Sequence, residues 1–195
     1  MNLYSRLALI PALLAVPAFA QTASYSIDPA HSEVDFSIRH MAISTVHGRF
    51  NLKDGTIVLD PNDVTKSSVE AVIDVPTVDT GTAQRDTHLK SADFFDAAKF
   101  PIATFHSERI THSGDGYDVA GNLTLHGITK PVVLHMDAPS KDQIGTDGKP
   151  HRGFSATTTL HRQDFGLVWN GTMKSGDNVL GDDVKMNFEI EAGQK

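Results

Sequence analysis

The chain has 195 residues, with 17 Lys and Arg against 24 Asp and Glu, and it contains no cysteine. The resulting formal net charge of -7 argues against nucleic acid as a partner and against strong attraction to anionic membranes, because both carry negative charge. Without cysteine, no disulfide supports the fold and no thiolate performs chemistry, so stability must come from the core and the backbone hydrogen bonds.

The N-terminus has the pattern of a secretory signal peptide. Arg6 supplies a positive charge, Leu7 to Phe19 contain no charged residue, and Ala18-Phe19-Ala20 matches a small-x-small cleavage site. We predict a signal peptide over residues 1–20, with an uncleaved anchor as the alternative, and one mature domain over 21–195 that is exported to the periplasm. Cleavage removes one basic residue, so 16 Lys and Arg remain against 24 Asp and Glu and the net charge becomes -8.

The mature chain alternates apolar and polar residues with a period of two, which is typical of strands with one buried and one solvated face. In the last such segment, Val184, Met186, Phe188 and Ile190 alternate with polar and charged residues. Strands are predicted over Tyr25–Ile27, Glu33–His40, Phe50–Leu52, Thr56–Leu59, Ser67–Val75, Ile102–Ile110, Tyr117–Leu125, Ile128–Ala138 and Gly153–Leu160, with a last strand through Val184–Ile190.

Turn residues separate these strands. Asp54-Gly55 is a strong hairpin signal, because both central positions of a type I′ turn favour positive φ. Pro76 is predicted to end the preceding strand, because proline cannot donate to a sheet ladder. The alternation then stops over residues 77–101, where we predict a short helix and a loop, and it stops again after His161.

Many half-buried antiparallel strands must either close on themselves or expose sheet edges. The fold class is therefore all-β, and we expect a closed antiparallel barrel. An outer-membrane barrel is disfavoured, because the outward positions include Glu70, Asp74, Lys185 and Glu189, where lipid would require apolar side chains.

A set of ordered motifs resembles the YceI-like family of bacterial periplasmic polyisoprenoid-binding proteins between about Ser24 and Ala192. The motifs are Tyr25-x-Ile27-Asp28-x-x-His31-Ser32, Phe36-x-Ile38-x-His40, Gly48-x-Phe50, Arg85-Asp86-x-His88-Leu89, Asp93-Phe94-Phe95-Asp96, Phe100-Pro101, Phe105-x-Ser107, Gly121-x-Leu123-x-Leu125-x-Gly127, Arg162-x-x-Phe165-Gly166 and Gly181-Asp182-x-Val184. The resemblance implies a lipocalin-like eight-stranded barrel whose apolar tunnel holds a polyprenyl pyrophosphate or an isoprenoid quinone. It implies a role in isoprenoid transport, storage or metabolism, and no cofactor.

The inward positions of such a barrel would form the tunnel, and small residues among them (Ala71, Ala103, Gly121 and Ala156) would leave room for a ligand. The predicted tunnel residues are Phe36, Ile38, Phe50, Leu89, Phe94, Phe95, Phe105, Leu123, Phe154 and Phe188. The predicted head-group residues near an opening are Arg85, His88, Arg162 and Trp169. Arginine can bind phosphate, and histidine can donate a hydrogen bond to a quinone carbonyl. The indole of tryptophan suits a rim that is partly exposed to water. The competing interpretation is that the charged residues in this set form local ion pairs and cap loops.

Other functions stay open. A lipid hydrolase or isomerase would use Asp86, His88 or Arg162, and a structural or stress-linked barrel would have a filled interior. The ten histidines show no metal-ligand spacing, so no metal site is predicted. Transient contact with a membrane or membrane protein during ligand exchange, and a homodimer, are both compatible with the sequence.

Overall fold

The computed structural model describes residues 22–195, so the predicted signal peptide lies outside the described residues. Among these residues, no helix is both long and apolar enough to cross a membrane. The elements are β1 (Ala23–Ile27), β2 (Glu33–His40), β3 (Ser44–Leu59), η1 (Val64–Lys66), β4 (Ser68–Asp79), α1 (Ala83–Lys90), β5 (Ile102–Ser113), β6 (Gly116–Leu125), β7 (Ile128–Met136), β8 (Gln143–Ile144), β9 (Pro150–His161), η2 (Arg162–Phe165) and β10 (Leu180–Gln194).

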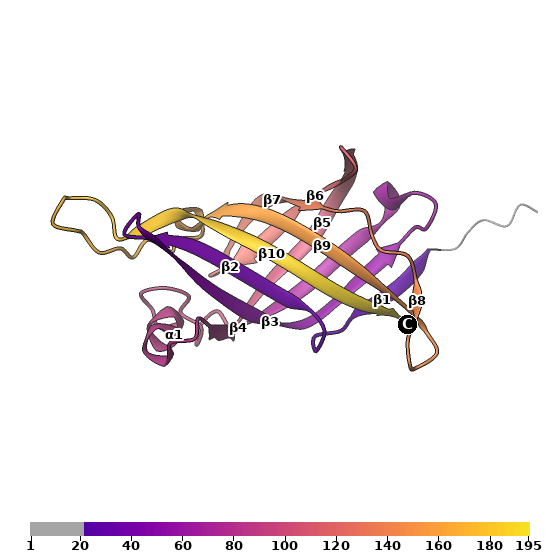
Figure 1. The fold of residues 1–195 in the computed structure, drawn as a ribbon, viewed down its shortest axis with the longest axis horizontal. Coiled ribbons are helices and arrows are strands. Elements are labelled where there is room, and N and C mark those ends of the chain that lie inside the picture. Colours follow the sequence, from indigo (N-terminus) through magenta and orange to yellow (C-terminus); the bar gives the residue numbers. More distant parts are fainter. Residues whose placement is uncertain (1–21) are drawn as a thin grey trace, which may run out of the picture.

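Eight strands form a closed antiparallel barrel, which confirms the predicted fold class (Figure 1). Strands β2 to β7 pair each with the next, β7 pairs with β9, and β10 pairs with both β9 and β2 to close the barrel. Strand β1 bridges the ends of β3 and β10, and β8 extends β9. Because every barrel strand has two neighbours, the closed ring removes the exposed edges that an open sheet would have.

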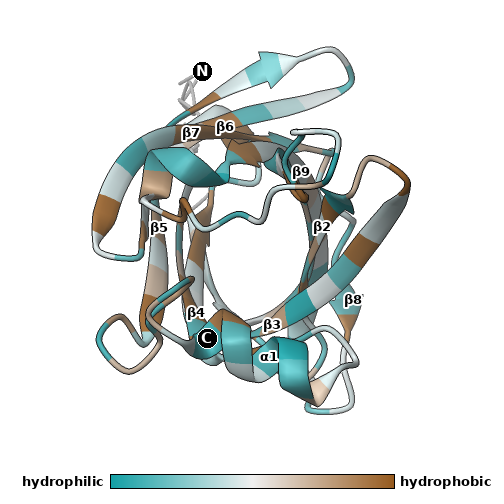
Figure 2. Cartoon of the chain, turned by 90° about the vertical axis from the view of Figure 1, so that its left-hand side faces the viewer, coloured by the Kyte–Doolittle hydropathy of each residue, from teal (hydrophilic) through white to brown (hydrophobic). Residues whose placement is uncertain are grey.

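The alternation of apolar and polar residues sets the two faces of the barrel wall. On β2, Val34 and Phe36 are buried while Glu33 and Arg39 are exposed, as the period of two predicts. Figure 2 looks at the barrel from the end where α1 lies across the rim, and Figure 1 shows the C-terminus and β1 at the opposite end. At about 3.3 Å per residue, β3 extends about 50 Å along its own direction.

The predicted hairpin at Asp54-Gly55 is wrong. These residues lie inside the single strand β3, next to a β-bulge between Leu52 and Asp54, and the true turn to β2 is at residues 41–43. Gly55 does not have positive φ. Close packing favours glycine there, because a Cβ at this position would lie 2.9 Å from the backbone carbonyl oxygen of Glu70 and 2.4 Å from the end of the Ile27 side chain.

The prediction that Pro76 ends a strand is also wrong, since β4 continues to Asp79. The pairing of β4 with β3 shifts between Asp74 and Asp79, so Pro76 lies where the ladder is already irregular. Within that irregularity the backbone N–H of Asn51 donates to the hydroxyl of Thr77 at 2.9 Å, so a proline costs little.

Residues 77–101 contain the predicted short helix, α1. The carboxylate of Asp86 accepts hydrogen bonds from the backbone N–H of Thr80 at 2.9 Å and from its hydroxyl at 2.5 Å. Arg85 donates to the Thr80 hydroxyl at 2.7 Å and to the Thr80 carbonyl at 2.8 Å. These bonds tie the residue that follows β4 to the first turn of α1.

Candidate ligand cavity

The barrel is hollow. An elongated cavity of about 530 Å³ lies inside it, within the range of about 300–1,000 Å³ that is common for ligand pockets. Its wall is built from inward side chains of β2 to β7, β9 and β10. Residues of α1, of residues 91–95 and of the segment after η2 line one end. The prediction of a filled structural barrel is therefore not supported.

The two ends of the cavity differ in chemistry. We call the first the apolar end, where Ile27, Leu52 and Ile57 line the wall near β1. We call the second the polar end, and its polar side chains are His40, Ser44, Arg85, His88, Arg162 and Trp169. Thr158 on β9 is a further polar residue of the wall, and its hydroxyl donates to the Val133 carbonyl at 2.8 Å. Leu180 pairs with His40, and the Trp169 ring contacts His88, so these residues gather at one end. Among the described residues that line the cavity there is no carboxylate.

The structure places every predicted tunnel and head-group residue on the cavity wall. These are Phe36, Ile38, Phe50, Leu89, Phe94, Phe95, Phe105, Leu123, Phe154 and Phe188, together with Arg85, His88, Arg162 and Trp169. Their role in binding a ligand stays a prediction. Sequence analysis missed His40, Ser44 and Val46, although Val46 shares the inward parity of Phe50 and would have been found by extending that strand backwards.

Three aromatic rings connect α1 to the segment after η2. The His88 ring lies edge-on to Phe94 and to Trp169, with centroids 5.0 Å apart in both pairs, and Phe94 and Trp169 are also 5.0 Å apart. His88 Nε2 lies 3.0 Å from a carboxylate oxygen of Asp93, which accepts the hydrogen bond. The polar end is thus lined by a packed aromatic cluster drawn from two distant segments of the chain.

Arg162, predicted to lie near an opening, has a buried side chain that is held by backbone carbonyls. Its side chain is only 4% exposed. Nε donates to the Gly181 carbonyl at 2.9 Å, and Nη1 donates to the carbonyls of Trp169, at 2.9 Å, and Leu167. Burial lowers the pKa of Arg162 from its ordinary value, and the charge of Asp182 opposes that shift. The guanidinium anchors the chain on both sides of residues 168–180.

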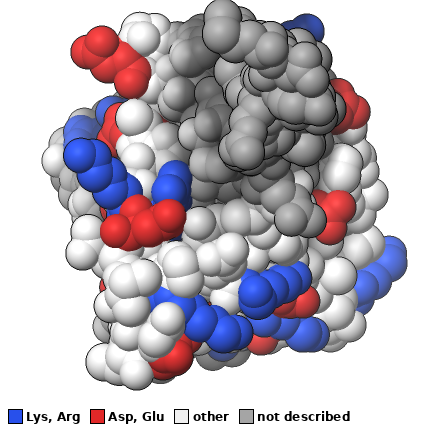
Figure 3. All heavy atoms as spheres, turned by 90° about the vertical axis from the view of Figure 1, so that its right-hand side faces the viewer, with Lys and Arg blue, Asp and Glu red and all other residues white. Residues whose placement is uncertain are grey.

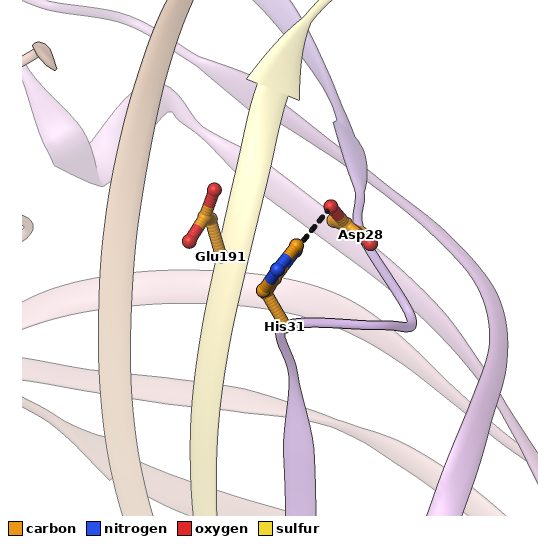
Figure 4. A group of neighbouring side chains, drawn as sticks. All are labelled: Asp28, His31 and Glu191. Atoms are coloured by element: carbon orange, nitrogen blue, oxygen red, sulfur yellow. Dashed lines mark hydrogen bonds and ion pairs between the residues drawn. The ribbon is translucent and has the colours of Figure 1, made fainter. Parts of the chain in front are cut away.

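The end of the barrel near β1 carries a histidine and carboxylate cluster formed by Asp28, His31 and Glu191 (Figure 4). One ligand atom from each lies within 4.8 Å of the others, and His31 Nδ1 is 2.8 Å from Asp28 Oδ2. His151 also bonds Glu191, at 3.0 Å. Figure 3 shows basic and acidic side chains interspersed over the visible part of this end. Asp28 and His31 are three residues apart, but Glu191 lies 160 positions after His31, which is why no spacing in the sequence revealed the cluster.

The pKa of His31 is raised by its hydrogen bond to Asp28, and the pKa of Asp28 is lowered chiefly by the same bond. The stabilisation that protonated His31 gives the folded state is therefore complete at pH values below its unfolded pKa of 6.5. It is lost as the pH rises through the higher pKa of the folded state. The stabilisation from ionised Asp28 is complete at pH values above its unfolded pKa of 3.8, and it is lost as the pH falls through the lower pKa of the folded state. We expect NMR titration of His31 to give a pKa above 6.5.

The substitution Asp28→Asn should lower that titration midpoint, because it removes the charge that favours protonated His31. Asp164→Asn, on η2 at the opposite end of the barrel, is the control and should leave it unchanged. An unaltered His31 midpoint in Asp28→Asn would show that the pair does not form in solution.

A closed antiparallel barrel with an elongated apolar cavity and polar groups at one end defines a ligand-holding barrel of the lipocalin-like kind. Comparison with family models matches residues 25–192 to the YceI-like domain. The chain belongs to this family.

Among relatives, a UPF0312 protein of Vibrio cholerae serotype O1 is 39% identical over 189 residues, covering 95% of both chains. The crystal structure of BcnA of Burkholderia cenocepacia matches with a TM-score of 0.72 at 25% identity, over 85% of this chain and 98% of that one. The YCEI protein of Campylobacter jejuni matches with a TM-score of 0.65 at 32% identity, over 80% of this chain and 90% of that one. A structure described as a polyisoprenoid binding domain from Saccharophagus degradans has a TM-score of 0.61 at 17% identity. The match covers 89% of this chain and 99% of that one and shows a shared fold.

Proposed function

We propose that this protein binds a long isoprenoid lipid in the barrel cavity and carries or stores it in the periplasm. The observation on which the proposal depends is the cavity itself, an elongated apolar space whose polar side chains are gathered at one end. That arrangement fits an amphiphile with one long hydrocarbon chain and one polar head, with the chain directed toward Ile27 and Ile57.

The energetics favour such a ligand over a small polar one. Each methylene group moved from water into the cavity contributes roughly 0.8 kcal/mol, so a long chain offsets the entropy lost when a flexible molecule is immobilised. The cavity wall offers few hydrogen-bonding groups, so a polar metabolite would lose its hydration without replacement.

Membership of the YceI-like family and the description of a structural neighbour as a polyisoprenoid binding domain both support an isoprenoid ligand. The sequence pattern of residues 1–20 supports export, and an exported carrier would let a lipid cross an aqueous compartment. Exchange with a membrane or membrane protein would then complete the transfer.

The residues of the enzyme alternative have structural partners. Asp86 is bonded to Thr80 and does not line the cavity, and His88 is bonded to Asp93 rather than to Asp86. A general acid or base must reach the group that it protonates or deprotonates, and these contacts direct Asp86 away from the cavity. The geometry therefore favours binding over catalysis.

Mass spectrometry of an organic extract tests the proposal. Mature protein purified from periplasm without detergent is expected to release a polyprenyl compound in near-stoichiometric amount, and incubation should leave that compound chemically unchanged. A fatty acid or amide would keep the lipid-binding barrel and replace the isoprenoid assignment. An extract without lipid, from protein that also fails to take up added polyprenyl lipid, would refute the proposal.

A further inference from the structure

Exposed apolar side chains are concentrated at the polar end of the barrel. The large hydrophobic residues that are exposed in the described part of the chain are Met41, Ile43, Ile102, Ile128, Val133, Ile144 and Val168. All except Val133, within β7, and Ile144, at the opposite end, lie in a connection at the polar end or begin the strand that follows one. Single exposed apolar residues are normal, whereas their collection at one end points to an interaction.

The turn between β2 and β3 lies beside the segment after η2 at this end. The Met41 N–H donates to the Val179 carbonyl at 2.6 Å. Asn170 exchanges two hydrogen bonds of 2.9 Å each with the backbone of Leu180. Because Val179 and Leu180 are consecutive, the turn and Val168, two residues before Asn170, are held against the same part of the chain.

Ile128 lies against the same segment. Its Cδ1 atom is 3.2 Å from the position that a Cβ on Gly166 would occupy, and the Val168 N–H donates to the Gly166 carbonyl at 3.0 Å. Leu167 and Trp169, the chain neighbours of Val168, line the cavity wall. We define the apolar rim as Met41, Ile43, Ile128 and Val168. It therefore borders the polar end of the cavity without forming part of its wall.

The turn between β2 and β3 exposes its apolar residues at a conformational cost. Met41 and Ala42 have positive φ values of 51° and 58°. Asn and Gly usually occupy such positions, because a larger side chain is disfavoured there. Arg39 holds the turn in place by donating from Nη2 to the Ala42 carbonyl at 2.6 Å. Apolar residues kept in an unfavourable conformation indicate a requirement other than turn formation.

The two ends of the barrel also differ in charge. The connections at the polar end are residues 41–43, 80–101, 126–127 and 162–179, and those at the opposite end are residues 28–32, 60–67, 114–115 and 137–149. The first set contains five Lys and Arg and five Asp and Glu, whereas the second contains three Lys and Arg and seven Asp and Glu. An anionic membrane surface would therefore repel the opposite end and not the polar end.

We propose that the apolar rim docks the protein on a lipid bilayer, with the polar end of the cavity toward the membrane. This inference rests on the proposed function and deepens it, because it assigns the surface across which the lipid is exchanged. A stable protein–protein interface needs about 800 Å² of complementary surface per partner, whereas the rim consists of separate side chains between polar loop residues. A fluid bilayer adapts to such side chains and buries them at its interface with water.

Co-sedimentation of lipid-loaded mature protein with phosphatidylcholine vesicles tests the inference. The double substitution Ile43→Ser and Val168→Ser removes the most exposed rim side chains, which are 77% and 66% exposed. We expect vesicle partitioning to fall about tenfold for each side chain removed, and the transfer of lipid from protein to vesicles to slow with it. The lipid-to-protein ratio should stay unchanged, since neither residue lines the cavity.

Ile144→Ser is the matched control, because Ile144 is 70% exposed at the opposite end of the barrel and should leave partitioning unchanged. A second variant separates loss of the rim from misfolding. Met41→Asn with Ala42→Gly places favoured residues at the two positions of positive φ. Its melting temperature should stay the same or rise while its partitioning falls.

The outcomes are distinguishable. The docking surface is refuted if wild-type protein does not sediment with vesicles, if the double variant sediments like wild type, or if Ile144→Ser lowers sedimentation as much as the double variant. A partner protein would then be the alternative occupant of the rim. Wild-type protein that holds no lipid but still sediments through the rim would instead refute the proposed function and leave the docking surface in place.

Discussion

Ala156→Phe is expected to empty the barrel of lipid without unfolding it. Ala156 lies on β9, is half-buried and lines the cavity between the strands that carry Met136 and Phe188. A phenyl ring there occupies space that the ligand needs. If it displaces three methylene groups, at roughly 0.8 kcal/mol each, the affinity falls about fiftyfold. Overpacking a filled core costs about 1–3 kcal/mol, and the void should keep the cost at the low end of that range.

The control for this substitution is Thr157→Phe. Thr157 is the next residue on β9 and is exposed, since successive residues of a strand point to opposite faces. It adds the same ring to the outside of the barrel and should leave the extracted lipid unchanged. The measurement is the lipid-to-protein ratio of the purified variants, with thermal unfolding to verify the fold. Normal lipid content in Ala156→Phe would show that the ligand does not occupy this part of the cavity.

Gly121→Ala is expected to destabilise the protein by about 2–3 kcal/mol, which lowers the melting temperature by about 8 °C for a domain of this size. Gly121 lies on β6 opposite Ser107, beside the bulge in β5. A Cβ on Gly121 would lie 2.4 Å from the backbone carbonyl oxygen of His106 and 2.7 Å from the Phe105 ring. Backbone cannot move aside cheaply, so the two strands must separate locally.

Gly153→Ala provides the comparison. Gly153 is also a strand glycine, but the nearest atom to its Cβ would be the Ser140 hydroxyl oxygen at 3.6 Å, an ordinary contact. Because alanine loses less backbone entropy on folding than glycine, this change should be neutral or stabilising by up to about 1 kcal/mol. Equal melting temperatures for the two variants would contradict the account of Gly121.

The candidate site was predictable in part. The tunnel residues on β2, β5, β6, β9 and β10 follow from strand parity alone, because a closed wall must turn one face of each strand inward. Arg162 was identified as a head-group candidate, but its burial and its three carbonyl partners depend on Leu167, Trp169 and Gly181, which no local pattern connects. The cluster of Asp28, His31 and Glu191 was missed because Glu191, on the last strand, is distant in sequence from the other two.

The errors in the fold have a common cause. Asp54-Gly55 and Pro76 are residues with strong local turn or breaker preferences, yet both lie within strands. At Gly55 the close approach of the Glu70 backbone and of Ile27 leaves little room for a side chain. Near Pro76 the pairing of β4 with β3 is irregular, so a missing N–H donor breaks no regular ladder bond. Contacts between segments distant in the chain outweigh a local preference of about 1 kcal/mol.

By itself, the alternation of apolar and polar residues determined that this chain forms strands with one apolar face. The expected barrel closure is seen in the pairing of β10 with both β2 and β9. A period of two is a local property, so it can be read without knowledge of the partners of each strand. The tertiary structure alone decided that the closed barrel stays hollow, that its polar groups gather at one end, and that Arg162 Nη2 is left unpaired there. Those features depend on how side chains from opposite walls meet, and volume and hydrogen-bond partners across a barrel are not encoded in any one strand.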